Sequence, residues 1–256
     1  MGFFSFLDPA LNFIFGPLLS LPAFWAILIM SFLISLIIVL IYKFATNQNL
    51  MKQLKDEIKT LQKQAKELKH EPEKAMAVQK KAMQTNMKYM MQSMKATLLT
   101  FIPIIIIFGW LQGHFAFMPI LPDQDFTMTL DFEDGAKGNV SVSVPEGIEV
   151  IGDKSRTVED SQVIFGFRGK KGVYDSPPVE FSFDDKEYEK EVIITSGKEY
   201  VEPVKRISDD NIESITTSNE KNVVMNLFGW KLGWLGSYII FALVFSLALR
   251  KLMKVY

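Results

Sequence analysis

Cysteine is absent from the 256-residue chain, and only two histidines, His70 and His114, are present. The lack of cysteine excludes a disulfide framework, a thiolate zinc site, an iron–sulfur cluster and a cysteine nucleophile. Two separated histidines leave no imidazole cluster for a metal. The sequence also lacks paired carboxylates, a nucleophile triad and a phosphate-binding loop in its apolar and basic parts. We therefore expect neither an enzyme nor a cofactor.

Long uncharged runs are what the chain has instead. Apolar residues make up 48% of the sequence, and a membrane-spanning helix needs about 20 mostly apolar residues. Three stretches meet this requirement, at residues 22–42, 96–118 and 232–249. The four tryptophans fall toward one interface, as in an aromatic belt; they are Trp25, Trp110, Trp230 and Trp234. The sequence thus predicts three membrane spans.

Basic residues near the span ends predict the orientation. Nine lie on one side, including Lys43, Lys95 and Arg250, whereas only Lys221 and Lys231 lie on the other. By the positive-inside rule, the N-terminus and residues 119–231 are outside, and residues 43–95 and the C-terminus are cytoplasmic. Residues 1–21 contain Pro9 and Pro17 and predict a segment lying in the membrane interface. These features indicate a multi-pass protein of the cell membrane.

Segment 43–95 predicts a cytoplasmic coiled-coil hairpin. Apolar residues from Met51 to Leu68 recur at helical spacing, Pro72 breaks the pattern, and a second helix returns to Lys95. Methionine dominates the returning helix, which we expect to place its methionine row in the hairpin seam. Because methionine accepts many apolar partners, the row also predicts a capture surface for substrates; its residues are Met76, Met83, Met87, Met90, Met91 and Met94. Simple hairpin packing is the alternative.

The same segment carries twelve lysines against five acidic residues, a net charge of +7. Such an excess suits anionic lipid headgroups or the RNA surface of a ribosome. Residues 119–225 are the opposite, with 23 acidic against 12 basic residues. Alternating runs such as 126–132 and 140–144, separated by turn residues, predict an antiparallel β-sandwich. We therefore expect an acidic extracytoplasmic β domain at 119–225, followed by the third span and a cytoplasmic tail at 226–256.

This arrangement resembles the archaeal YidC-like proteins of the Oxa/YidC/Alb insertase superfamily, and the third subunit of the endoplasmic-reticulum membrane protein complex is similar. The likeness rests on topology, on the hairpin between the first two spans, and on the methionine-rich approach to the second span at 83–94. The resemblance implies insertion of nascent membrane proteins without ATP, through a hydrophilic groove open to cytoplasm and lipid. The expected partners are therefore client membrane proteins, the lipid bilayer and small membrane-protein subunits, with a ribosome as a further partner through the lysine-rich hairpin.

Polar residues within the spans are the candidates for lining such a groove. A charge at the bilayer centre costs about 2.5–3.5 kcal/mol on insertion scales. A polar lining would therefore lower the free-energy barrier to the passage of a polar client segment. The alternative is that these hydroxyls merely bond backbone carbonyls. The candidates are Ser31, Ser35, Tyr42, Thr97, Thr100, Gln112, Ser237, Tyr238 and Ser246, with Lys43 at the end of the first span.

Two departures from the superfamily stand out. Its bacterial members carry an arginine within the groove, whereas no arginine lies within a span here, and Lys43 is the nearest substitute. Their five-span core is also reduced to three spans. Two other functions therefore stay open: a membrane-anchored sensor or tether that reads the outside through its β domain, and a small-ion channel.

Overall fold

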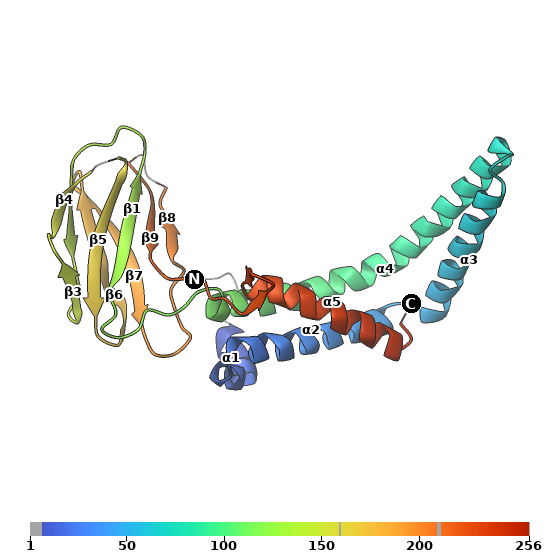
Figure 1. Ribbon diagram of the computed structural model, residues 1–256, viewed down its shortest axis with the longest axis horizontal. Coiled ribbons are helices and arrows are strands. Elements are labelled where there is room, and N and C mark those ends of the chain that lie inside the picture. Colours follow the sequence, from blue (N-terminus) through green and yellow to red (C-terminus); the bar gives the residue numbers. More distant parts are fainter. Residues whose placement is uncertain (1–6, 159, 209–210, 256) are drawn as a thin grey trace. The chain divides into compact units, whose positions relative to one another are not determined.

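The computed structural model describes residues 7–158, 160–208 and 211–255. The chain forms two compact units. One holds the helical residues up to Gly109 together with those from Leu235 onwards, and the other runs from Trp110 to Trp234. The helices are α1 (Asp8–Phe15), the 3-10 helix η2 (Gly16–Ser20), α2 (Ala23–Ala45), α3 (Gln48–Glu67), α4 (Pro72–Phe115) and α5 (Trp234–Leu252) (Figure 1).

Three of these helices are long and apolar enough to cross a membrane, namely α2, α4 and α5. The prediction of three spans is confirmed, and the chain is a multi-pass membrane protein. Before the first span, α1 exposes Phe13 and Ile14, which is consistent with the predicted interfacial segment. Residues 1–6 of that segment lie outside the described part of the chain.

Helix α4 is a single helix of 44 residues. At 1.5 Å per residue it is about 66 Å long, roughly twice the thickness of the hydrocarbon core. Pro103 lies inside it, as spanning helices tolerate when neighbouring groups satisfy the freed carbonyl. The second hairpin helix and the second span were predicted as separate segments. They are therefore one continuous helix.

Helix α3 and the first part of α4 form the helical hairpin (Figure 1). The Asn47 side chain caps α3 by accepting a hydrogen bond from the Leu50 amide at 3.1 Å. On α3, the predicted positions Met51, Leu54 and Leu61 are buried. Across the hairpin, the Thr85 hydroxyl donates to Glu57 Oε1 at 3.4 Å. Helix pairing through this face of α3 agrees with the sequence pattern, whereas supercoiling stays a prediction.

The β-rich region consists of antiparallel sheets. A five-stranded sheet has the order β3-β5-β1-β9-β8, and a four-stranded sheet has the order β4-β2-β6-β7. Their bounds are β1 (Phe126–Phe132), β2 (Asn139–Ser143), β3 (Ile148–Ile151), β4 (Ser155–Thr157), β5 (Gln162–Gly169), β6 (Gly172–Phe183), β7 (Lys186–Ile194), β8 (Val204–Arg206) and β9 (Ile212–Thr217). A short hairpin of β10 (Met225–Leu227) and β11 (Trp230–Leu232) follows.

One apolar core joins the two large sheets. Alternate residues of β1 are buried, as the alternating sequence predicts. Phe132 and Phe183, from opposite sheets, meet edge to face with their ring centroids 5.0 Å apart. The ring centroids of Phe165 and Phe181, also from opposite sheets, are 5.7 Å apart. These contacts between inward faces make the region a sandwich, which we call the β domain (β1–β9).

Within its own unit, the β domain is tied to the C-terminal end of α4 and the first residue of α5. The Tyr200 hydroxyl donates to the Gln112 carbonyl, and the Ala116 amide donates to that hydroxyl at 3.0 Å. Trp234 Nε1 donates to Gln112 Oε1 at 3.1 Å. Burial raises the pKa of Tyr200 to about 12. Gln112 therefore links the end of α4, the first residue of α5 and the β domain.

A buried cation lies in the four-stranded sheet. Lys190 is buried on β7, and its ammonium donates to the Glu202 carbonyl at 2.6 Å. Burial, together with the nearby charge of Lys205, lowers the pKa of Lys190 from 10.5 to about 8. The folded state therefore disfavours the protonated form of Lys190, and protonation of Lys190 destabilises the fold.

The stability of the β domain is therefore expected to rise with pH. Between the folded pKa of about 8 and the unfolded value of 10.5, the unfolded chain binds more protons, so the free energy of unfolding increases by about 1–2 kcal/mol from pH 7.5 to 9.5. Urea unfolding of a fragment of residues 119–225 measures this change. In Lys190→Met the rise should be largely lost. An equal rise in both proteins would contradict the assignment to Lys190.

Candidate functional site

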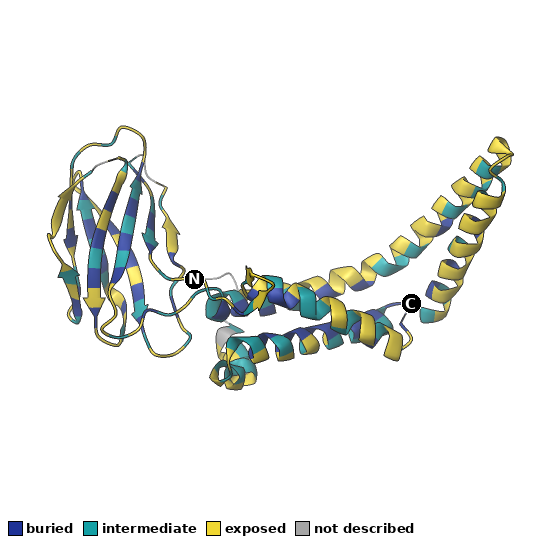
Figure 2. Cartoon of the chain, viewed as in Figure 1, coloured by how far each residue is buried: buried dark blue, intermediate teal, exposed yellow. Residues whose placement is uncertain are grey.

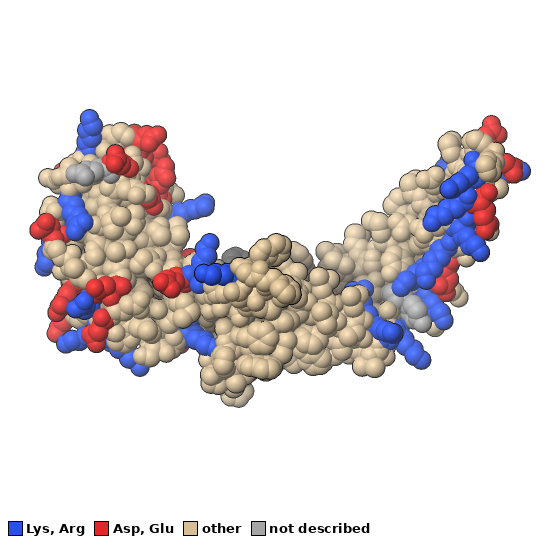
Figure 3. All heavy atoms as spheres, viewed as in Figure 1, with Lys and Arg blue, Asp and Glu red and all other residues tan. Residues whose placement is uncertain are grey.

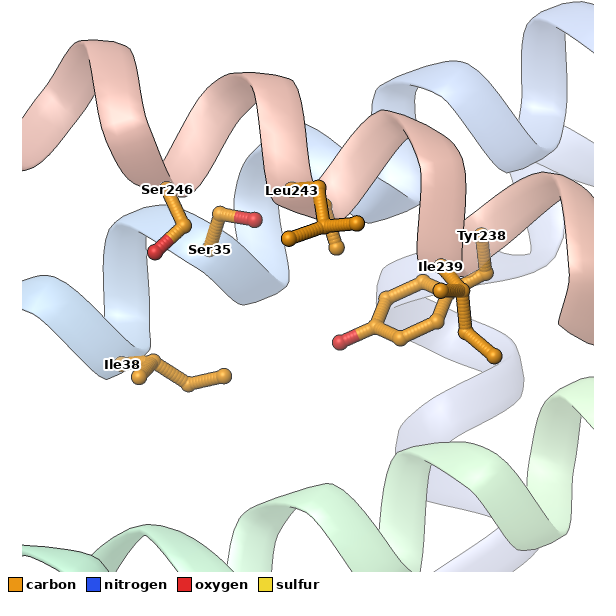
Figure 4. A pocket seen from close by; sticks show the side chains of 7 residues that line it. Ser35, Ile38, Tyr238, Ile239, Leu243 and Ser246 are labelled. Carbon is orange, nitrogen blue, oxygen red and sulfur yellow. The ribbon is translucent and has the colours of Figure 1, made fainter.

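A cavity of about 280 Å³ lies between α2 and α5. Its lining combines three hydroxyl side chains with four apolar ones; they are Ser35, Tyr238 and Ser246, and Ile38, Ile239, Ala242 and Leu243 (Figure 4). Ser35 lies near the middle of α2, so its hydroxyl sits at the depth where an unpartnered polar group costs most. Three polar side chains of the spans thus converge on this cavity.

The hydroxyls of the cavity come from facing helices. Ser35 is only 2% exposed, and it reaches the cavity from α2, whereas Ser246 reaches it from α5 (Figure 4). Tyr238 lies two helical turns before Ser246, and its hydroxyl points into the space beside Ile38 (Figure 4). The structure thus brings together Ser35 and Ser246, two predicted groove residues that are 211 positions apart in the sequence.

Other predicted groove residues do not line the cavity. The Ser31 hydroxyl donates to the Ile27 carbonyl at 2.6 Å, the Thr97 hydroxyl to Ser93 at 3.1 Å, and the Thr100 hydroxyl to Thr97 at 2.8 Å. These bonds to carbonyls of their own helices are the ones that the alternative expects, and a groove role for the three residues stays a prediction. Ser237 is fully buried, and its hydroxyl has no hydrogen-bond partner among the described residues.

An arginine stands close to the cavity, at the end of α5. The Arg250 guanidinium lies 5.0 Å from the ring centroid of Tyr42, a cation–π contact. Arg250 is four residues after Ser246 and Tyr42 is seven after Ser35, so each continues the face that lines the cavity. Lys43, the expected substitute cation, lies half-buried in the last turn of α2. From the sequence, Arg250 was used only to predict the orientation, although its spacing of four residues from Ser246 places both on one face of α5.

The methionine row was expected in the hairpin seam, and this prediction was wrong. All six methionines are exposed, with 56–71% of each residue accessible. The less exposed residues of α4 belong to the neighbouring row, which faces α3; they are Ala75, Val78, Ala82, Thr85 and Tyr89. Small side chains such as Ala75 and Ala82 let the two helices approach closely, so this row packs against α3. The methionines lie about 100° around the helix from it and therefore stay outside the seam. Packing therefore does not explain the methionines.

The exposed methionines form what we call the methionine surface, comprising Met76, Met83, Met87, Met90, Met91 and Met94. Its helix face continues toward the membrane through Leu98, Phe101 and Ile105, which are also exposed. Figure 2 shows how much of α4 is exposed along this part of the hairpin. Because α4 is unbroken, an apolar strip runs from the hairpin into the second span.

Basic side chains flank this strip. Lysines gather over the α3–α4 hairpin (Figure 3), and two of them form ion pairs with acidic residues of the hairpin, Lys63–Glu67 at 3.9 Å and a close Lys74–Glu71 pair. Both are exposed, so they contribute little to stability.

A comparison with protein families finds a match over half of the chain. The family model described as integral membrane protein EMC3/TMCO1-like matches residues 12–139. This range includes α2, the hairpin, all of α4 and strand β1. No curated protein and no solved structure matches the chain.

Water should reach the cavity between α2 and α5. The chain has no native cysteine, so Ser35→Cys and Ser246→Cys each introduce a single thiol. A thiol reacts as the thiolate, which forms only where water is present, so both should react with a small, water-soluble reagent about tenfold faster than Val244→Cys, whose position is exposed on another face of α5. Mass spectrometry of timed samples gives the rates. Rates no higher than that of Val244→Cys would show that the cavity is dry.

Proposed function

Because the chain belongs to the EMC3/TMCO1-like family of integral membrane proteins, part of the Oxa1/YidC/Alb3 insertase superfamily, we propose that it receives nascent membrane proteins from the cytoplasm and inserts them without ATP. Membership itself indicates an insertase-related role at the bilayer, with membrane-protein clients. The proposal goes further, to the surfaces that perform the two steps of capture and insertion.

The observation that carries the proposal is the methionine surface on α4. Six flexible, polarisable side chains are exposed on a helix that continues into the membrane. Such side chains adapt to apolar segments of different shape. An apolar client segment bound there is already adjacent to the helix face formed by Leu98, Phe101 and Ile105. Capture and delivery would thus use one continuous face of one helix.

The cavity supplies the second step. A client that crosses the bilayer must bring polar backbone or charged groups through the hydrocarbon, where each charge costs about 2.5–3.5 kcal/mol on insertion scales. Hydroxyls of Ser35, Tyr238 and Ser246 give such groups hydrogen-bond partners at mid-membrane. Arg250, over Tyr42, adds a positive charge that attracts acidic client segments, the role expected for Lys43.

In the proposed membrane orientation, the hairpin lies in the cytoplasm, and the N-terminus and the β domain lie outside. The basic residues of the hairpin and of the α5 end support it through the positive-inside rule. In this orientation the net charge of +7 on residues 43–95 faces the ribosome and the anionic inner leaflet. Both are polyanionic, so either would hold the hairpin near emerging clients.

The methionine surface is expected to determine client capture. Changing Met83, Met87, Met90 and Met94 together to Gln leaves the hairpin seam intact, because all four are exposed. Insertion of a small single-span client into vesicles should fall about tenfold, the effect of losing ~1.4 kcal/mol of apolar contact. The same four changed to Leu keep the apolar area, so insertion persists for some clients and the range of accepted clients narrows.

Met118→Gln is the matched control, since Met118 is exposed but lies beyond the end of α4, and it should insert clients at the normal rate. Circular dichroism checks that the helices remain. Full activity of the folded glutamine variant toward several clients would reject capture by these methionines.

A further inference from the structure

The short β10–β11 hairpin stands directly before the third span. Only Gly233 separates Leu232, the last residue of β11, from Trp234, the first residue of α5. The base of the hairpin is fixed within its unit: the Val224 amide donates to the Leu232 carbonyl at 2.9 Å, and the Asn222 amide donates to the Ala116 carbonyl at 3.0 Å. The hairpin is thus held where the chain enters the membrane.

The strand register gives the hairpin two unlike faces. Met225 pairs with Leu232 and Leu227 pairs with Trp230, whereas Asn226 pairs with Lys231 between them. Since side chains alternate across a strand, the four apolar residues share one face and the two polar residues share the other. Trp230 is 75% exposed on the apolar face. Figure 2 shows the segment before α5 mostly exposed.

The turn places a large apolar side chain at the tip. Phe228 and Gly229 have φ angles of +51° and +94°, as a type I′ turn requires, and Asn226 Oδ1 accepts the Gly229 amide at 3.0 Å. Asparagine is favoured at the first of these positions, and a bulky residue with positive φ is an outlier. Phe228 is 99% exposed. The turn therefore carries a residue that its backbone disfavours, with its ring directed away from the protein.

We propose that this hairpin inserts its apolar face and its Phe228 tip into the lipid leaflet on the side of the β domain. Lipid is the occupant that the chain itself indicates, because the hairpin adjoins a membrane-spanning helix. Tryptophan is enriched at the membrane interface, and a lysine beside it reaches the headgroup phosphates; Trp230 and Lys231 supply this pair. An isolated two-stranded hairpin is only marginally stable in water, so burial in lipid also stabilises it.

A depth measurement in membranes tests this proposal. The full chain, which has no native cysteine, is labelled with an environment-sensitive fluorophore at Leu227→Cys and reconstituted in phosphatidylcholine–phosphatidylglycerol vesicles. Its emission should be quenched by lipids carrying a nitroxide on the acyl chain and protected from aqueous iodide. A label at Lys137→Cys, an exposed site between β1 and β2, should show the reverse.

Phe228→Asn in the Leu227→Cys protein separates insertion from turn formation. The Asn-Gly pair suits the type I′ turn, so the hairpin is retained while the apolar tip is removed, and nitroxide quenching should fall at least halfway to the Lys137→Cys value. The proposal is overturned if iodide reaches the Leu227→Cys label as readily as the Lys137→Cys label. It is also overturned if the label is shielded from iodide but insensitive to lipid nitroxide, because a protein surface would then cover it.

Discussion

The cost of an unpartnered polar group in hydrocarbon determines how this protein is built. Three helices cannot surround a large aqueous chamber, and the hydroxyls of Ser31, Thr97 and Thr100 bond carbonyls of their own helices. Ser35, Tyr238 and Ser246 instead face a common cavity. In the proposed function, a client that passes through the bilayer is the occupant that these hydroxyls serve.

The continuity of α4 connects the membrane-spanning helices to the α3–α4 hairpin. A break before the second span would leave the methionine surface free to move relative to the membrane. The 44-residue helix instead keeps Met94 and Leu98 one turn apart on the same rod. The superfamily's task requires apolar segments to be kept from water and then released into lipid, and one helix face with exposed apolar residues at both levels suits both steps.

Composition and periodicity were sufficient for the large elements. Uncharged runs located α2, α4 and α5, and the alternation at Phe126–Phe132 matched β1 residue for residue. The sequence pattern assigned the methionine row of α4 to the hairpin seam, because methionine is more apolar than alanine and threonine. The structure places the neighbouring row, which includes Ala75, Ala82 and Thr85, against α3 instead. Strand β9 escaped notice since Ile212 and Ile215 do not alternate strictly. The cavity depends on how α2 and α5 face each other, and single-residue patterns within each helix do not contain that information.

The central claim is that clients pass from the methionine surface to the cavity, and site-specific photo-crosslinking tests it most directly. A photoreactive residue is placed at Met87, at Ser246 or, as control, at Val244, and ribosome-bound nascent membrane proteins of increasing length are presented to the reconstituted protein. The account predicts that short nascent chains crosslink to Met87 and that longer ones crosslink to Ser246, with Val244 contacting mainly lipid. Nascent chains that crosslink to neither Met87 nor Ser246 at any length would contradict the account and favour the sensor or channel alternatives.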